Sequence, residues 1–127
     1  MATLKTNTLT GTSTAGAIAV TAEGNSTTTN LQQGLAKMWA NVDGTGTAAL
    51  DDSFNASGLT DNGTGDFTVA INNDMSNADY SCQFNGNSAH VGLTAIATGS
   101  LQVFVTAAND SSQDVDPVTY TAHGDLA

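Results

Sequence analysis

The sequence DNGTG at residues 61–65 is followed by DFTVAIN at residues 66–72. The Asn-Gly pair supplies the positive φ angles that a tight β-hairpin turn requires. Phe67, Val69 and Ile71 then alternate with polar or smaller residues, which is the period of a strand that buries one face. These residues predict a hairpin whose returning strand is half buried.

The segment LAKMWANV at residues 35–42 predicts a second strand upstream of this hairpin. Alternation places its smaller apolar and aliphatic residues on one face, which we expect in the core, and Lys37, Trp39 and Asn41 on the other. The second face is either the other apolar side of a buried strand or an anchor for a neighbouring chain. Lys37, Trp39 and Asn41 are therefore the candidate subunit-contact residues, with a plain surface lysine as the alternative at position 37.

Further strand-like segments follow the same rhythm, with turn clusters about every 8 to 14 residues. Phe54 is the expected apolar anchor of the strand at residues 50–59, and a single helical turn is expected at residues 31–34. Lys, Arg and Glu, which usually cover exposed helix faces, are nearly absent. We therefore expect an all-β protein, an antiparallel β-sandwich or jelly-roll-like fold of about 8 or 9 short strands. The remaining expected strands lie at residues 3–10, 17–21, 79–84, 90–97, 100–107 and 117–123.

The length of 127 residues fits one domain, expected to bury roughly two-thirds of the surface of its unfolded chain. We expect a single sandwich domain over residues 1–127, in which residues 1–30 are a candidate N-terminal arm for assembly or attachment. Residues 1–14 lack a basic region followed by an apolar run, and no apolar stretch approaches roughly 18 residues. This predicts synthesis in the cytoplasm and no membrane partner.

The charge balance is strongly acidic: Lys5 and Lys37 stand against 12 acidic residues, for a formal net charge of -10. Binding of phosphate, nucleic acid or anionic membranes relies on clustered Lys or Arg. The sequence excludes these partners and predicts a water-facing surface made mainly of hydroxyl and amide groups. Such a surface is more typical of a structural component than of an enzyme.

No motif in the chain predicts a catalytic site or a metal site. His90 and His123 are the only side chains with an ordinary pKa near neutrality, and no nucleophile elbow or metal-binding histidine spacing accompanies them. Asp51 and Asp52 are adjacent in a strand, so they point to opposite faces and are interpreted as surface residues or partners of Lys37. We expect no enzyme activity.

The loop at residues 109–116 gathers oxygen ligands, with Asn109, Asp110, Asp114 and Asp116 as candidates for binding a ligand or calcium. It lacks the glycine and the terminal glutamate of an EF-hand loop, which favours a solvated loop. We therefore expect no cofactor, with calcium as the alternative. The single cysteine, Cys82, is expected to be a small core residue.

Several segments of the chain resemble structural proteins of tailed bacteriophages, particularly phages of marine bacteria and cyanobacteria. The segments are TTTNLQQGLAKMWANVDGTG at residues 27–46, DSFN at 52–55, DNGTGDFTV at 61–69, the bend at 75–80 and HGDLA at 123–127. Many of those proteins have an aromatic residue where this chain has His123.

This resemblance implies a non-enzymatic virion protein, homotrimeric, on the outer surface of the particle and made in the bacterial host cytoplasm. The single-domain length favours a capsid decoration (cement) or head-fibre subunit, whose partners are itself and the major capsid protein or tail proteins. The alternative is a distal tail-fibre, receptor-binding tip that recognises host surface glycans through Trp39 and its polar loops. A glycan hydrolase is a third hypothesis, but it needs a carboxylate pair that the sequence does not show.

Overall fold

The computed structural model describes residues 3–24, 26–87 and 89–127, in two compact units, Met1–Leu35 and Ala36–Ala127. The described part of the chain forms ten strands and one 3-10 helix. No helix in the described ranges is long and apolar enough to cross a membrane.

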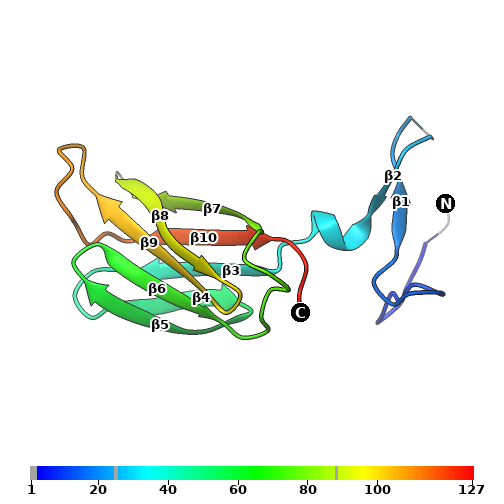
Figure 1. Ribbon diagram of the computed structural model, residues 1–127, viewed down its shortest axis with the longest axis horizontal. Coiled ribbons are helices and arrows are strands. Elements are labelled where there is room, and N and C mark those ends of the chain that lie inside the picture. Colours follow the sequence, from blue (N-terminus) through cyan, green and yellow to red (C-terminus); the bar gives the residue numbers. More distant parts are fainter. Residues whose placement is uncertain (1–2, 25, 88) are drawn as a thin grey trace. The chain divides into compact units, whose positions relative to one another are not determined.

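The second unit is a β-sandwich of two four-stranded antiparallel sheets (Figure 1). The first sheet has the order β4-β3-β10-β7 and the second sheet has the order β5-β6-β9-β8. The strands of the first sheet are β3 (Met38–Asp43), β4 (Ala49–Phe54), β7 (Ser81–Gly86) and β10 (Val118–His123). Those of the second sheet are β5 (Ala56–Gly63), β6 (Asp66–Ile71), β8 (His90–Ala97) and β9 (Ser100–Thr106). This architecture confirms the predicted antiparallel β-sandwich.

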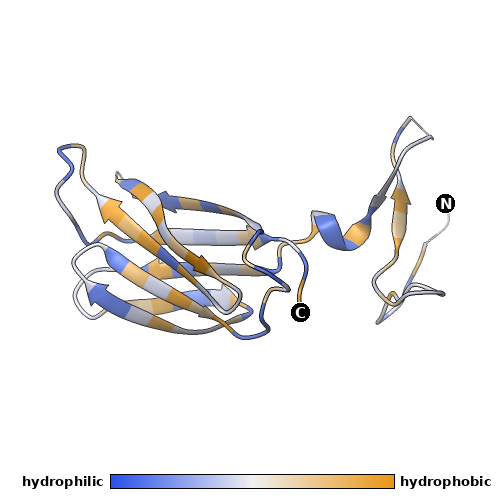
Figure 2. Cartoon of the chain, in the orientation of Figure 1, coloured by the Kyte–Doolittle hydropathy of each residue, from blue (hydrophilic) through white to orange (hydrophobic). Residues whose placement is uncertain are grey.

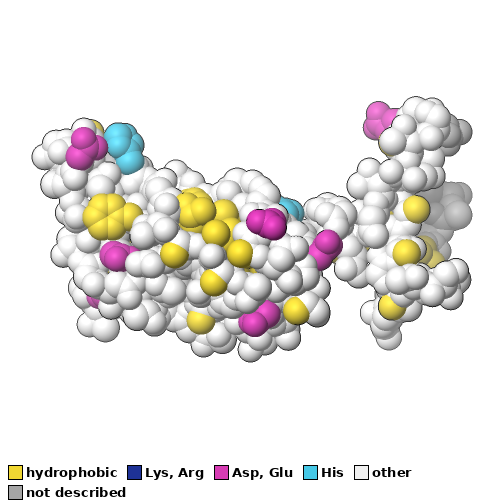
Figure 3. Space-filling view, viewed as in Figure 1, with side chains coloured by type: hydrophobic (Ala, Val, Ile, Leu, Met, Phe, Trp, Pro, Cys, Tyr) yellow, Lys and Arg dark blue, Asp and Glu magenta, His cyan; other side chains and the backbone are white. Residues whose placement is uncertain are grey.

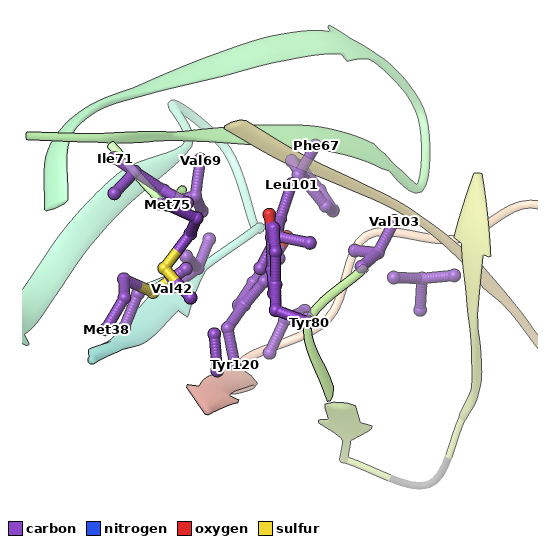
Figure 4. Packing of buried hydrophobic residues seen from close by; sticks show 14 residues of the cluster. Met38, Val42, Phe67, Val69, Ile71, Met75, Tyr80, Leu101, Val103 and Tyr120 are labelled. Atoms are coloured by element: carbon purple, nitrogen blue, oxygen red, sulfur yellow. The ribbon is translucent and has the colours of Figure 1, made fainter. Parts of the chain in front are cut away.

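The core lies between the sheets and is built from alternating residues of the four central strands (Figure 2). Each central strand contributes three buried side chains: Met38, Ala40, Val42, Val118, Tyr120, Ala122, Phe67, Val69, Ile71, Leu101, Val103 and Val105. Met75 and Tyr80 from the connection between β6 and β7 complete the cluster (Figure 4). The inward faces predicted for residues 35–42 and 66–72 are therefore confirmed.

The strand predicted at residues 50–59 is divided into β4 and β5 by Asn55, so the prediction of one continuous strand was wrong. Asn55 has a φ of 56°, in the left-handed region that Asn tolerates better than most residues. Its side-chain amide nitrogen donates to the carbonyl oxygens of Lys37 (2.9 Å) and Asn73 (3.1 Å). Its amide oxygen accepts from the backbone nitrogen of Asn73 at 2.7 Å. These contacts fix the point at which the chain leaves the first sheet and enters the second.

The hairpin of β5 and β6 is confirmed, but its tip lies two residues later than the Asn-Gly pair suggested. β5 continues through Gly63, which has a φ of 132°, and the turn is made by Thr64 and Gly65. The extension is accommodated by an irregular register between Asp61 and Gly63. The backbone nitrogen of Gly65 donates to the Asp114 carboxylate at 2.7 Å, which ties this turn to the loop before β10.

The first unit contains an antiparallel pair, β1 (Ala19–Thr21) and β2 (Thr28–Asn30), followed by the 3-10 helix η1 (Leu31–Gly34). The side chain of Asn30 caps η1 by accepting from the backbone nitrogen of Gln32 at 2.9 Å, which confirms the predicted helical turn. Residues 3–10 form no strand, so that prediction was wrong for the single chain. The Thr6 hydroxyl instead bonds the backbone of Thr8 and bends the segment.

Candidate interaction surface

An aromatic pair lies on the outer face of the first sheet. Trp39 of β3 is directly opposite Phe54 of β4, and Thr121 and Gln83 continue the same row across β10 and β7. Trp39 is 37% exposed and Phe54 is 53% exposed. Two adjacent aromatic rings open to solvent, with hydroxyl and amide groups beside them, form a surface suited to contact with another molecule.

The position of Phe54 differs from the prediction that it anchors the core. Asn41 pairs with Asp52, whereas the next residue of β3, Val42, pairs with Leu50, which leaves Asp51 as an extra residue in β4. A one-residue bulge reverses the side-chain alternation beyond it. Leu50 therefore faces the core side while Phe54 faces outward beside Trp39. The adjacent Asp51 and Asp52, which interrupt the apolar alternation, are the sequence signal for this bulge.

The three predicted subunit-contact residues are in different environments. Lys37 is only 6% exposed, and its backbone nitrogen donates to the Ala122 carbonyl oxygen at 2.8 Å. The alternative of a plain surface lysine is therefore wrong. Asn41 is partly buried, and its side-chain oxygen has no hydrogen-bond partner among the described residues. Trp39 is thus the member of this set that offers a large exposed side chain, and its role in a subunit contact stays a prediction.

Carboxylates gather where β3 ends and β4 begins. The carboxylate of Asp43 accepts from the hydroxyl (2.6 Å) and the backbone nitrogen (2.7 Å) of Thr45, and these bonds lower the pKa of Asp43. The pKa of Asp116 is raised by partial loss of hydration and by the nearby charges of Asp43 and Asp51. This end of the sandwich therefore has a negative potential.

The four candidate ligands in the loop at residues 109–116 contact different neighbours. Asn109 accepts from the Ser111 hydroxyl at 2.6 Å, and Asp114 accepts from Gly65. Asp116 lies near the carboxylates of β3 and β4, and Asp110 has a φ of 63°. In the described ranges, no group of three or more His, Cys, Asp or Glu residues is placed to hold a metal ion. Calcium binding by this loop stays a prediction.

The remaining reactive side chains are dispersed. His90 lies on β8 opposite Thr106 in the second sheet, and His123 lies on β10 opposite Ser81 in the first. Cys82 is partly buried against the core from the edge strand β7, and this burial raises the pKa of its thiol. A half-buried position at the core edge agrees with the structural role predicted for Cys82.

No protein-family model, curated protein or solved structure matches this chain. A function can therefore be proposed only from the geometry of each of the two units and from the resemblance of the sequence segments.

Proposed function

We propose that this chain is a non-enzymatic structural protein of a tailed-phage particle, displayed on the outer surface as a capsid decoration or head-fibre subunit. The observation that carries the proposal is a difference in burial between the two parts of the chain. No described residue of 3–35 is buried, whereas residues 36–127 enclose a complete core. A segment that buries so little of itself gains order by packing on other chains, as an attachment arm does.

The distribution of charge supports the same assignment. Residues 1–35 contain one lysine and one glutamate, which cancel. Residues 36–127 contain one lysine and 11 aspartates and so carry the whole net charge of -10. The face of the sandwich in Figure 3 accordingly shows acidic side chains but no Lys or Arg among the described residues. An acidic sandwich is repelled by a packaged genome and suits the solvent side of a shell, while the neutral segment suits attachment to protein.

The position on the particle is tested by counting copies. Purified virions should contain this chain in numbers comparable with the major capsid protein, measured by quantitative mass spectrometry, and cryo-electron microscopy should place it on the head. A handful of copies at the tail end would favour the tail-fibre alternative. Complete absence from purified virions would overturn the proposal.

A second candidate function, recognition of host surface glycans at a fibre tip, is favoured by the exposed pair Trp39 and Phe54. Aromatic rings pack against the apolar faces of sugars, and neighbouring Thr121, Gln83 and Asn85 offer hydroxyl and amide groups for hydrogen bonding. On isolated host envelope glycans, Trp39→Ala and Phe54→Ala should abolish binding under this alternative. Phe104→Ala is the matched control, because Phe104 is exposed on the outer face of the second sheet.

The same glycan samples test the non-enzymatic part of the proposal. The wild-type protein should release no reducing sugar from them. Release that is abolished by Asp51→Asn or Asp52→Asn would contradict the proposal and restore the hydrolase hypothesis.

A further inference from the structure

The first unit exposes most of its large apolar side chains. Leu4 is 76% exposed, Leu9 53%, Val20 48% and Leu35 51%. The pair of β1 and β2 has only three residues in each strand, and a two-stranded hairpin is at best marginally stable alone in water. Within one chain, these residues lack the burial that would offset the entropy of ordering them.

Residues 3–10 also lack a partner strand among the described residues of the chain. Their sequence, TLKTNTLT, is rich in the β-branched threonine and predicts a strand, yet the described segment pairs with no strand of its own chain. A strand-forming segment with exposed apolar side chains, and with no partner strand among the described residues of its own chain, is a template for pairing with another chain.

The distribution of charge favours a second copy of this protein as that other chain. Two sandwiches of this protein repel each other, since each carries a formal charge of -10. On β4, Asp51 and Asp52 closely precede Phe54 of the exposed aromatic pair. A contact between two copies of residues 1–35 adds no repulsion of its own, because each of these segments is neutral overall. Lys5 and Glu23 are both exposed and opposite in sign, so they can pair between copies.

We propose that copies of this chain associate through residues 3–35, with Leu9 and Val20 of each copy forming a shared apolar core and residues 3–10 pairing between copies. The inference deepens the proposed function, on which it rests, by placing the subunit contact in the first unit and not on Trp39.

Sedimentation of the full-length protein at tens of micromolar in 0.15 M NaCl tests the inference. The wild-type chain, of 12.8 kDa, should sediment as an oligomer, with three chains expected from the phage resemblance. The double variant Leu9→Asp with Val20→Asp should sediment as a monomer, because it introduces like charges into the shared core. Trp39→Ser and Phe104→Ser, which remove exposed aromatic residues from the sandwich, should leave the oligomer intact.

Thermal unfolding of each variant shows whether the sandwich is still folded. The double variant lies outside the core of residues 36–127, so its unfolding should remain cooperative. A wild-type chain that is monomeric at every concentration would overturn the inference. It would also be overturned if Trp39→Ser dissociated the oligomer while the double variant did not.

Failure here is distinguishable from failure of the proposed function. An oligomer that depends on the first unit, in a protein absent from purified virions, would retain the inference and reject the virion assignment. A monomeric protein present at high copy number on the capsid would support the virion assignment and reject the inference.

Discussion

The hydroxyl of Tyr80 donates a hydrogen bond to the carbonyl oxygen of Ala97 at 2.8 Å, which joins the connection before β7 to the end of β8. The carbonyl oxygen of Ser100 lies at 3.3 Å from the same hydroxyl. Tyr120 is buried in the same core, but its hydroxyl has no hydrogen-bond partner among the described residues. The core therefore contains two tyrosines in opposite hydrogen-bonding states.

The two hydroxyls should respond differently to removal. Tyr80→Phe should lower the free energy of unfolding by about 1 kcal/mol, since it removes a hydrogen bond and leaves a carbonyl oxygen less well satisfied. Tyr120→Phe should be neutral or stabilising, because it removes an unsatisfied polar group and keeps the edge-to-face contact with Phe84, whose ring centroid is 5.9 Å away. Urea unfolding of both variants measures the difference. A clear loss in Tyr120→Phe would reveal a bound water or another partner for that hydroxyl.

Alkaline pH should destabilise the sandwich through the same residues. Burial, followed by the proximity of Cys82, raises the pKa of Tyr80 to about 12, and burial also raises the pKa of Tyr120. Unfolded tyrosines ionise near pH 10, so above that pH the unfolded chain binds fewer protons than the folded one, and stability falls as pH rises.

Absorbance at 295 nm measures this ionisation directly. These are the only tyrosines of the sequence, so the folded protein should show little tyrosinate at about pH 10.5, and urea should release the signal. Tyrosinate formed near pH 10 in a chain that is still folded would contradict the burial of both rings.

Asn55 should be among the least replaceable polar residues of the sandwich. Asn55→Ala removes its bonds to Lys37 and Asn73 and places alanine in a left-handed conformation that it tolerates poorly, so unfolding should become easier by about 2 to 4 kcal/mol. Asn55→Gly loses the bonds but tolerates the φ angle, and should cost roughly 1 kcal/mol less than alanine. Equal losses in the two variants, measured by denaturant unfolding, would show that the φ angle carries no cost.

Two glycine substitutions contrast filled and open space. A β-carbon at Gly44 would lie 2.7 Å from the ring of Phe67 and 2.9 Å from the Val115 carbonyl oxygen, so Gly44→Ala should destabilise by about 1 to 3 kcal/mol. A β-carbon at Gly92, on β8, would meet no atom within 4 Å, and Gly92→Ala should be neutral or slightly stabilising. Thermal unfolding compares them, and similar melting temperatures would reject the crowding at Gly44.

Salt should strengthen self-association. The sandwiches repel one another through a net charge of -10, and the Debye length shortens to roughly 8 Å at 0.15 M ionic strength. The dissociation constant measured by sedimentation should therefore decrease as the NaCl concentration is raised from about 0.02 M to about 0.3 M, because screening removes repulsion while the apolar contacts persist. Association that weakened steadily over this range would show that opposite-charge pairs such as Lys5 with Glu23, and not the apolar contacts, dominate the interface.

The sequence was sufficient to predict strands where one face is continuously buried. Met38, Ala40 and Val42 alternate without interruption, and so do Phe67, Val69 and Ile71, because period two is imposed by the core itself. The outward position of Phe54 could not be predicted in this way, since it depends on the bulge at Asp51, which is set by pairing with β3. The burial of Lys37 and the left-handed Asn55 likewise depend on where the chain crosses between sheets.

The error at residues 3–10 has a different physical source. Threonine favours strands, but a strand forms only where a partner strand is present, and the described part of the single chain supplies none. The candidate surface is predicted only in part by the sequence. Alternation puts Trp39 on the outer face of its strand, whereas its aromatic neighbour Phe54 is expected in the core.

The four central strands divide their residues between two tasks, since every second side chain is committed to the core and the intervening ones face outward. Mutations can therefore accumulate on both outer faces while the buried register stays constant. A protein built in this way can change the residues that another molecule contacts on its surface and still fold by the same twelve inward residues of β3, β6, β9 and β10. The chemistry of its outer surface can therefore change without a change in its stability.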